Sequence, residues 1–497
     1  MGSLDTAPER PRIARNTIFS AIGEGSNLLL FLLGFLAARY LAPEAFGAYS
    51  AAFAFVGIFR ILPDFGMAYA STLEISRDRS LAGRLIGNLL GFQGVLSLLT
   101  VVLCLGLGRL LFPTPEDRIT WTAVVLLSLD LVLKAAKATL RWLLKGFQRF
   151  GTEAVSLLLE RLALLALGLA SLRAGGGAIG FVLVFVIVRS FDTTGLWAYT
   201  SARVLRLRPA RDPALWAELL RKGLPFAYVG LVITLLFQVD IVLLERMRGA
   251  AAAGFYSAPV RVLEGLTLVP RILGYALLPT MAALNVRSPA AVGDLYRRGQ
   301  KYLLLAGLPL AAFGLLASAP FIRLVFGSDY MESIPLSRVL LPTALFMFLS
   351  NFSETTLACV NRWGTIVVTS TLVLLLNVAL NVLWIPLYGG TGAALARLLA
   401  EGAYALLTVT ALHVYGYRTQ WASVALRPLL ATAAFAAALW LSRDLGLLAA
   451  AALASAVFLL ATVLLGVWDA TEKATLRRLF RREPHAIAEG GVGPRQA

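Results

Sequence analysis

Residues 84–108 read RLIGNLLGFQGVLSLLTVVLCLGLG, and no charged side chain follows Arg84 in this run. A helix rises about 1.5 Å per residue, so about 20 consecutive apolar residues are enough to cross a bilayer. The run is therefore predicted to be a transmembrane helix. Over the whole chain of 497 residues, 58% are hydrophobic and 15% are charged, whereas a soluble domain has about 25% charged residues. This composition excludes a soluble enzyme and a disordered chain, and it predicts an all-α polytopic membrane protein.

Cysteine and histidine are too scarce for several classes of site. The chain has two cysteines and two histidines, which excludes a disulfide scaffold and a cysteine-based metal cluster. A histidine-based metal site is not expected either, so we predict no metal. The net charge is +17. Strong basic excess fits nucleic acid or a membrane surface, and the apolar content favours the membrane, so no nucleic-acid partner is predicted.

Fourteen apolar runs are long enough to cross a bilayer, so 14 transmembrane helices are predicted. An even number places both termini on one side. With the N-terminus in the cytoplasm, the inner segments hold 27 Lys and Arg residues and the outer segments hold 8, as the positive-inside rule requires. The runs are 17–38, 44–74, 84–108, 119–144, 152–173, 178–200, 223–245, 252–283, 302–325, 336–360, 364–386, 391–414, 424–441 and 446–468.

A short motif recurs after 207 residues. Gly47, Tyr49-Ser50-Ala51 and Pro63 match Gly254, Tyr256-Ser257-Ala258 and Pro270, in the second and eighth runs. After the fourth and tenth runs, residues 149–152 (RFGT) match residues 362–365 (RWGT) at an offset of 213. These offsets predict two pseudo-twofold-related six-helix lobes plus a C-terminal helix pair. Because six is even, the repeats are parallel, which is typical of transporters that rock one bundle against the other.

The predicted division of the chain follows from this repeat. It comprises a cytoplasmic N-tail (1–16), an N-lobe (17–200), a basic cytoplasmic linker (201–222), a C-lobe (223–414), an extra helix pair (424–468) and a basic cytoplasmic tail (469–497).

Basic residues inside the predicted helices are the main functional signal. Asp130, Lys134, Lys137 and Arg141 are spaced by four, three and four residues and share one face of a helix. Three positive charges beside one acid suit a polyanion, and phosphate in particular. A buried basic side chain costs about 2.5–3.5 kcal/mol in the bilayer, so these residues must line a wet cavity, pair with acids or reach the membrane surface.

Ion pairing is the alternative interpretation of these charges. Several bases lie one helical turn from an acid, where an ion pair can form. Such pairs would hold the helices together and would have no direct role in transport. The pairs are Arg60–Asp64, Asp130–Lys134, Arg189–Asp192, Arg261–Glu264 and Arg397–Glu401.

The sequence also resembles a known family. Residues 39–50 (RYLAPEAFGAYS), followed by Asp64-Phe65-Gly66, are similar to the opening signature of bacterial polysaccharide-biosynthesis transporters, although Ala38 stands where that family often has glycine. These proteins are the O-antigen-type flippases of the multidrug/oligosaccharidyl-lipid/polysaccharide exporter superfamily. The resemblance implies a V-shaped central cavity between the lobes, in the bacterial inner membrane, and no bound organic cofactor. It also implies that an undecaprenyl pyrophosphate-linked oligosaccharide for O-antigen, lipopolysaccharide or exopolysaccharide crosses to the outer leaflet.

Candidate site residues follow from the charges and the resemblance together. The pyrophosphate and glycan are expected to contact Lys134, Lys137, Arg141, Arg60, Arg261, Arg189, Arg161 and Arg271. A coupling cation, either a proton or sodium, is expected at Glu24, Asp240, Asp130 or Asp64. The expected partners are the lipid-linked glycan, membrane lipids and, in loose association, the glycan polymerase machinery.

Two other functions remain open from the sequence. A multidrug or organic-cation antiporter of the same superfamily would need an acidic, aromatic cavity, which the basic residues disfavour. A membrane glycosyltransferase or polymer ligase would need a catalytic pair of acids in a long outer loop, and only Glu116 and Asp117 resemble such a pair. The chain is therefore predicted not to be an enzyme.

Overall fold

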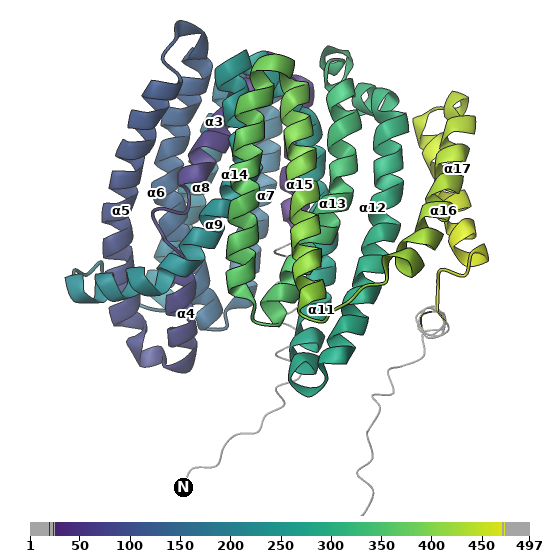
Figure 1. Cartoon of the computed structure of the whole chain (residues 1–497). Helices are drawn as coiled ribbons and strands as arrows, with labels where there is room; N and C mark the ends of the chain where they lie inside the picture. Colours follow the sequence, from purple (N-terminus) through teal and green to yellow (C-terminus); the bar gives the residue numbers. More distant parts are fainter. Residues whose placement is uncertain (1–18, 20–22, 24, 470–471, 473–497) are drawn as a thin grey trace, which may run out of the picture. The chain divides into compact units, whose positions relative to one another are not determined.

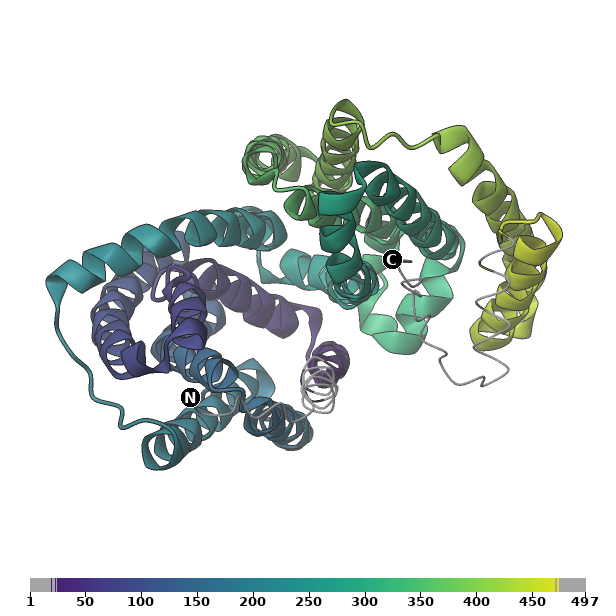
Figure 2. The ribbon, with the colours of Figure 1, turned by 90° about the horizontal axis from the view of Figure 1, so that it is seen from below.

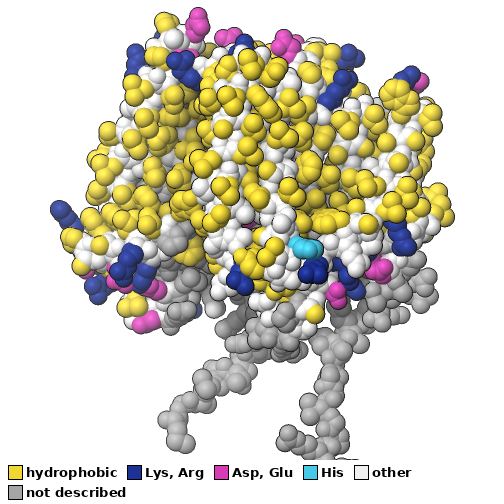
Figure 3. All heavy atoms as spheres, in the orientation of Figure 1, with side chains coloured by type: hydrophobic (Ala, Val, Ile, Leu, Met, Phe, Trp, Pro, Cys, Tyr) yellow, Lys and Arg dark blue, Asp and Glu magenta, His cyan; other side chains and the backbone are white. Residues whose placement is uncertain are grey.

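The computed structural model describes residues 19, 23, 25–469 and 472. Glu24, the predicted N-tail and nearly all of the predicted C-terminal tail lie outside the described residues. The described part is all-helical, as predicted, and contains no strand. Eleven of its helices are long and apolar enough to cross a membrane. On the face seen in Figure 3, hydrophobic side chains cover the middle, and charged side chains gather above and below them. The protein is a multi-pass membrane protein.

Figure 1 shows the arrangement of the helices. Most predicted runs fall within a single helix, whereas runs 44–74 and 252–283 are each divided between two helices. Short 3₁₀ turns cover Arg79–Leu81, Pro115–Asp117, Ser328–Tyr330 and Arg443–Leu445. The α-helices are α2 (Asn27–Tyr40), α3 (Pro43–Phe59), α4 (Met67–Arg77), α5 (Ala82–Leu111), α6 (Arg118–Gly146), α7 (Phe150–Arg173), α8 (Gly177–Arg203), α9 (Pro213–Arg248), α10 (Ala250–Leu266), α11 (Leu268–Arg287), α12 (Pro289–Val325), α13 (Ser333–Cys359), α14 (Trp363–Tyr388), α15 (Gly390–Val414), α16 (Trp421–Leu441) and α17 (Leu447–Leu464).

The chain forms two compact units, residues 1–419 and 420–497. The second unit contains the antiparallel pair α16 and α17, in which the Arg427 guanidinium donates to the Gly466 carbonyl at 2.6 Å. In the first unit, Figure 2 shows α2 to α8 in one group and α10 to α15 in another, and α9 runs along the first group towards the second. We call α2 to α8 the N-lobe and α9 to α15 the C-lobe.

The second and eighth predicted runs are both interrupted, and at matching places. The first interruption lies between α3 and α4, begins at Arg60 and includes Pro63. It ends at Phe65 and Gly66, whose φ angles of 45° and 72° are left-handed, a conformation that glycine adopts without steric cost. The second interruption lies at Thr267, between α10 and α11. Thr267 is 207 residues after Arg60, so the sequence repeat extends to the break in each helix.

Helices α3 and α10 cross at the two glycines of the repeat. An added Cβ at Gly47 would overlap the Ala250 carbonyl, and one at Gly254 would overlap the Pro43 carbonyl. Each glycine thus lets its own helix approach the backbone of the equivalent helix in the other lobe. This reciprocal contact is what a pseudo-twofold axis between the lobes requires, and only glycine fits it.

Replacing Gly47 by alanine is expected to destabilise the protein by about 1–3 kcal/mol, because the new methyl group meets backbone atoms that cannot move aside. The matched control is Gly57→Ala in the same helix, where an added Cβ meets nothing within 4 Å. This control should be neutral or stabilising, since alanine is the better helix former. Denaturant titration in mixed micelles measures both variants. Equal stability of the two would show that the α3–α10 crossing is looser than described.

The segment between the lobes is tied to the N-lobe by polar contacts. Asp212 accepts a hydrogen bond from the Leu215 amide at 3.2 Å and so caps α9. It also meets Arg84 at 3.2 Å. These two contacts hold the pKa of Asp212 below its usual range. Lys222 bonds Glu74 at 2.6 Å and Glu218 at 2.7 Å, which raises its pKa. The start of α9 is therefore fixed against α4 and α5.

Candidate functional site

A cavity of about 400 Å³ lies between the two lobes. Its walls come from α2, α3, α6, α7 and α8 of the N-lobe and from α10 and α11 of the C-lobe. All eight basic residues predicted to contact the substrate line this one cavity, although they are spread over more than 200 residues of sequence. They are Arg60, Lys134, Lys137, Arg141, Arg161, Arg189, Arg261 and Arg271.

The predicted basic stripe on α6 is present, and it is paired with acids. Lys134 Nζ lies 3.2 Å from Asp130 Oδ2, one turn earlier on the same helix. Arg189 from α8 donates to the same oxygen at 2.5 Å. Asp130 therefore joins α6 to α8 and holds both cations at the cavity wall.

Glu160 of α7 is the centre of a second cluster. Its carboxylate receives Lys137 at 2.9 Å, Arg141 at 2.8 Å and Arg161 at 3.3 Å, and Arg189 lies at 3.7 Å. A side chain placed among four cations is held firmly, because each charge-assisted bond is stronger than a neutral one.

Asp192 of α8 completes the cluster. It lies 3.4 Å from Lys137 and 3.1 Å from Arg141, and Ser156 donates to its other oxygen at 2.6 Å. Lys137 and Arg141 are thus each shared between two acids. Both interpretations of the α6 charges therefore describe part of the structure: the charges form ion pairs, and they also face the cavity.

Arg60 and Arg271 differ from the other six cations. Neither forms an ion pair within the described residues, and both side chains are exposed to the cavity that they line. Each lies next to a helix break, Arg60 at the end of α3 and Arg271 in the first turn of α11. Among the described residues, these two guanidinium groups are the cavity cations that an incoming anion reaches without displacing a carboxylate.

The cavity has a large excess of positive charge. Arg261 pairs with Glu264 at 2.8 Å. With Asp130, Glu160, Glu264 and Asp192 counted against the eight bases, the described groups have a formal excess of four positive charges. A low-dielectric cavity of one sign attracts counter-ions strongly, so this arrangement suits a polyanionic ligand.

Aromatic side chains also line the cavity, and the sequence analysis missed them. Lys134 Nζ lies 5.5 Å from the centre of the Phe53 ring, and the Arg189 guanidinium lies 5.0 Å from that of Phe185. Such cation–π contacts stabilise a desolvated cation. The signal was present in the sequence, because Phe181, Phe185 and Arg189 are spaced by four and share a helix face.

The carboxylates predicted for ion coupling form hydrogen bonds or ion pairs with other residues of the protein. Glu24 is the exception, because it lies outside the described residues. Asp64 accepts from Gln93 at 2.6 Å and from the Ala68 amide at 3.1 Å. Asp240 lies in the C-lobe, where it accepts from Arg397 at 2.9 Å and from the Tyr256 hydroxyl. Neither residue lines the cavity between the lobes.

The ion pairs expected from local spacing form in two of five cases. Asp130–Lys134 and Arg261–Glu264 are present. The other three expectations were wrong, because each base or acid has a different partner or none among the described residues. Asp64 bonds Gln93, Arg189 pairs with Asp130 and Glu160, and Arg397 pairs with Asp240.

Known structures share this fold. The lipid II flippase MurJ in an inward closed conformation matches with a TM-score of 0.75 and 14% identity, over 94% of this chain and 100% of that chain. An inward-facing MATE-family multidrug resistance transporter of the MOP superfamily matches with a TM-score of 0.65 and 14% identity, over 81% and 98%. A MOP superfamily transporter from Pyrococcus furiosus, whose binding pocket is described as having reverse polarity, matches with a TM-score of 0.51 and 15% identity, over 82% and 96%.

Sequence comparison adds the family. No curated protein sequence matches the chain. Residues 13–285 match the family model described as polysaccharide biosynthesis protein. This match includes all eight cavity cations and covers more than half of the chain. The fold is shared with the lipid II flippase MurJ and with a MATE-family transporter. The chain therefore belongs to the polysaccharide biosynthesis protein family.

Proposed function

We propose that this protein is a flippase for a polyprenyl-pyrophosphate-linked oligosaccharide, an O-antigen or exopolysaccharide repeat unit. In this proposal the protein lies in the bacterial inner membrane with both termini in the cytoplasm. The lobes alternately open the cavity to each side of the membrane, and the pyrophosphate binds to the cavity cations. Family membership and the MurJ-like fold support transport of a lipid-linked glycan.

The excess of positive charge in the cavity is the observation that carries the proposal. Arginine guanidinium groups bind phosphate oxygens in pairs with good geometry. Arg60 and Arg271 are placed on the two lobes, and both face the same cavity. A pyrophosphate between them would bridge the lobes, which gives the substrate a way to bias their relative movement.

An organic-cation antiporter is the competing function, because MATE transporters share the fold. A cationic drug would have to enter a cavity that already carries uncompensated positive charge, and like charges repel strongly where water is excluded. The fold is therefore compatible with organic-cation transport, whereas the positive charge of the cavity disfavours binding of a cation. Enzymatic activity has less support, because family and fold are those of transporters.

Binding to the purified full-length protein distinguishes these functions. We expect a short-chain polyprenyl pyrophosphate to bind at least about tenfold more tightly than the matching monophosphate, a difference of about 1.4 kcal/mol. A lipophilic cation should not compete. Tryptophan fluorescence or native mass spectrometry measures the affinities for the two lipids and the competition by the cation. Competition by the cation, without preference for the pyrophosphate, would replace the flippase proposal with the antiporter.

A further inference from the structure

A short basic segment leads from the end of α8 to the start of α9. Residues 203–211 read RVLRLRPAR, with four arginines and no acid. We call this segment the basic strap. All four arginines are exposed, and none forms an ion pair within the described part of the chain. Like charges held this close together repel one another, so the strap is stabilised by an anion that lies against it.

The backbone of the basic strap is fixed against α5. The Ala210 amide donates to the Gly87 carbonyl at 2.8 Å. An added Cβ at Gly87 would lie 2.6 Å from the Arg208 carbonyl oxygen, and one at Gly91 would lie 2.2 Å from that of Ala210. Only glycine allows the strap to approach α5 so closely, so the strap has a defined place on the N-lobe.

Side chains alternate along the basic strap. Leu205 and Leu207 pack against an apolar core formed by α4, α5, α6 and α9, whereas Arg206 and Arg208 are exposed. Successive side chains of an extended backbone point to opposite sides. Burial of the two leucines therefore turns both arginines away from the protein.

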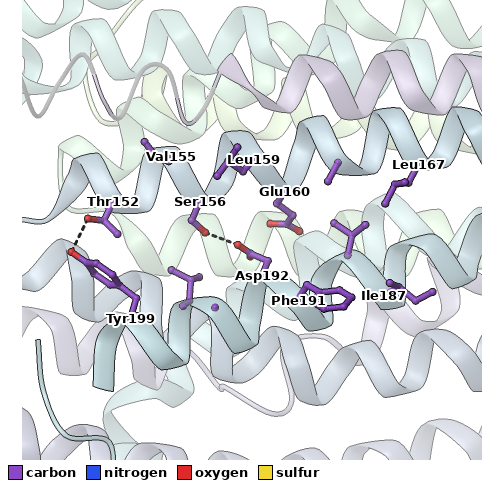
Figure 4. A pocket seen from close by; sticks show the side chains of 14 residues that line it. Thr152, Val155, Ser156, Leu159, Glu160, Leu167, Ile187, Phe191, Asp192 and Tyr199 are labelled. Atoms are coloured by element: carbon purple, nitrogen blue, oxygen red, sulfur yellow. Dashed lines mark hydrogen bonds between the residues drawn. The ribbon is translucent and has the colours of Figure 1, made fainter. Parts of the chain in front are cut away.

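Both ends of the basic strap are also held. Near the end of α8, the Tyr199 hydroxyl accepts from Arg149 at 2.9 Å and lies 3.2 Å from the Thr152 hydroxyl of α7 (Figure 4). At the other end, Asp212 caps α9 and meets Arg84. A ligand of the strap does not have to order its backbone first, which favours binding.

The basic strap lies at the edge of the apolar surface of α5. The exposed large apolar side chains of α5 begin at Val95, one turn after Gly91, and extend to Leu110. From Gly91 to Leu110 the helix rises about 29 Å at 1.5 Å per residue, which matches a hydrocarbon core of about 30 Å. Trp216 of α9 stacks on Phe92 at 5.0 Å, and tryptophan is enriched at the membrane interface. The strap is therefore at the depth of the lipid head groups.

The basic strap also lies on the side of the N-lobe that faces away from the C-lobe. Figure 2 shows the segment between α8 and α9 running along the outer edge of the N-lobe. None of its residues lines the cavity between the lobes. The anions nearest to the strap are therefore the head groups of the surrounding lipids.

We propose that the basic strap binds the head groups of anionic phospholipids, in the leaflet that the proposed orientation places on the cytoplasmic side. An anionic phospholipid carries a phosphodiester with no amine to balance it. Guanidinium groups bind phosphate oxygens in pairs, and each basic residue near an anionic membrane surface strengthens binding about fivefold. This inference goes beyond the proposed flippase function and does not use its cavity.

Membrane topology alone does not account for the basic strap. The positive-inside rule requires only that basic residues remain on one side of the membrane, and arginines on a free loop satisfy it equally well. In this protein, two glycines and two buried leucines hold the arginines in place at head-group depth. Such an arrangement is typical of a binding surface.

Photo-crosslinking tests which lipid contacts the basic strap. The probe is phosphatidylglycerol with a diazirine close to its phosphate, present at a low mole fraction in phosphatidylcholine nanodiscs that hold the full-length protein. A phosphatidylcholine probe of the same design is used in parallel. We expect residues 203–211 to be labelled at least about 25-fold more by the anionic probe.

Charge variants test the role of the exposed arginines. Arg206→Gln/Arg208→Gln should reduce labelling of the strap by the anionic probe about 25-fold, because two contributions of about fivefold are lost. Arg206→Lys/Arg208→Lys keeps both charges and should retain most of the labelling. The matched control is Arg109→Gln/Arg118→Gln, which removes two exposed arginines near the opposite end of α5 and should leave labelling of the strap unchanged.

A glycine variant tests the position of the strap without a change of charge. Gly91→Ala places a methyl group against the Ala210 carbonyl and displaces the strap, so labelling by the anionic probe should fall at least about fivefold, the contribution of one cation. The control is Gly94→Ala in the same helix, where an added Cβ meets nothing within 4 Å. Equal labelling of these two variants would overturn the strap as a binding site of defined shape.

Two further outcomes would overturn the inference. Equal labelling by the two lipid probes would show that the strap does not select anionic phospholipid. Loss of labelling when polyprenyl pyrophosphate is added would assign the strap to the substrate head group instead. The flippase proposal is tested separately, because Arg206→Gln/Arg208→Gln should bind polyprenyl pyrophosphate as the wild type does. Failure of the pyrophosphate to bind would overturn the flippase proposal and leave the lipid labelling of the strap unaffected.

Discussion

Replacing Arg60 and Arg271 together by glutamine is expected to weaken binding of polyprenyl pyrophosphate by about a hundredfold. A hydrogen bond to a charged group contributes about 1.5–3 kcal/mol, so two lost bonds correspond to at least a factor of about 100. Both side chains face the cavity, and neither forms an ion pair within the described residues. Glutamine keeps much of their length and hydrogen-bonding capacity and removes only the charge.

The fold should tolerate this double variant. Because no described carboxylate depends on Arg60 or Arg271, their loss leaves no buried acid without a partner. Replacing Lys137 and Arg141 instead would leave Glu160 and Asp192 undercompensated, and such a variant would lose stability along with binding. The unpaired arginines therefore test the role of the cavity more cleanly than the basic stripe on α6, which the sequence alone would select.

The control for this prediction is Arg338→Gln. Arg338 lies within α13, is exposed and does not line the cavity, so its loss should leave binding unchanged. Titration of the wild type and both variants with the same lipid gives the dissociation constants. A double variant that is folded and binds as tightly as the wild type would remove the two free guanidinium groups from the proposed site.

Much of the fold could be predicted because a bilayer imposes simple rules on sequence. Long apolar runs gave the helix positions, and the motif repeated after 207 residues indicated related halves. The structure adds what those rules do not contain. The run 44–74 is two helices, α3 and α4, because Pro63 and the left-handed Phe65-Gly66 pair interrupt it. Hydropathy alone indicates one continuous apolar segment and does not detect such a helix break.

The candidate site could likewise be predicted only in part. Basic residues within apolar helices had to face a wet cavity or acids, and the structure gathers the eight that were predicted to contact the substrate around one cavity. Their partners were harder to predict. Spacing along one helix indicates only neighbours one turn away, so Arg397 was matched with Glu401. Its partner in the structure, Asp240, is 157 residues away, and only the packing of α15 against α9 brings the two together.

This Arg397–Asp240 pair leads to the largest stability effect that we expect. The two side chains are 2% and 0% exposed and lie 2.9 Å apart in the C-lobe. Replacing Arg397 alone by methionine leaves a buried carboxylate whose remaining hydrogen-bond donors among the described residues are the Tyr256 hydroxyl and the Ile241 amide. Breaking a buried ion pair in this way costs about 3–5 kcal/mol, so Arg397→Met should lower the free energy of unfolding by that amount.

Restoring charge balance should recover most of the loss. In the double variant Arg397→Met/Asp240→Asn neither member of the pair is charged, and replacing a whole buried pair by uncharged residues is often neutral or stabilising. Denaturant titration of the wild type, the single variants and the double variant in mixed micelles gives the coupling between the two sites. A structural pair predicts strong coupling and unchanged pyrophosphate binding in the double variant, because neither residue lines the cavity. A stable double variant with impaired binding or transport would instead assign the pair a part in the transport cycle, as expected of a coupling site at Asp240.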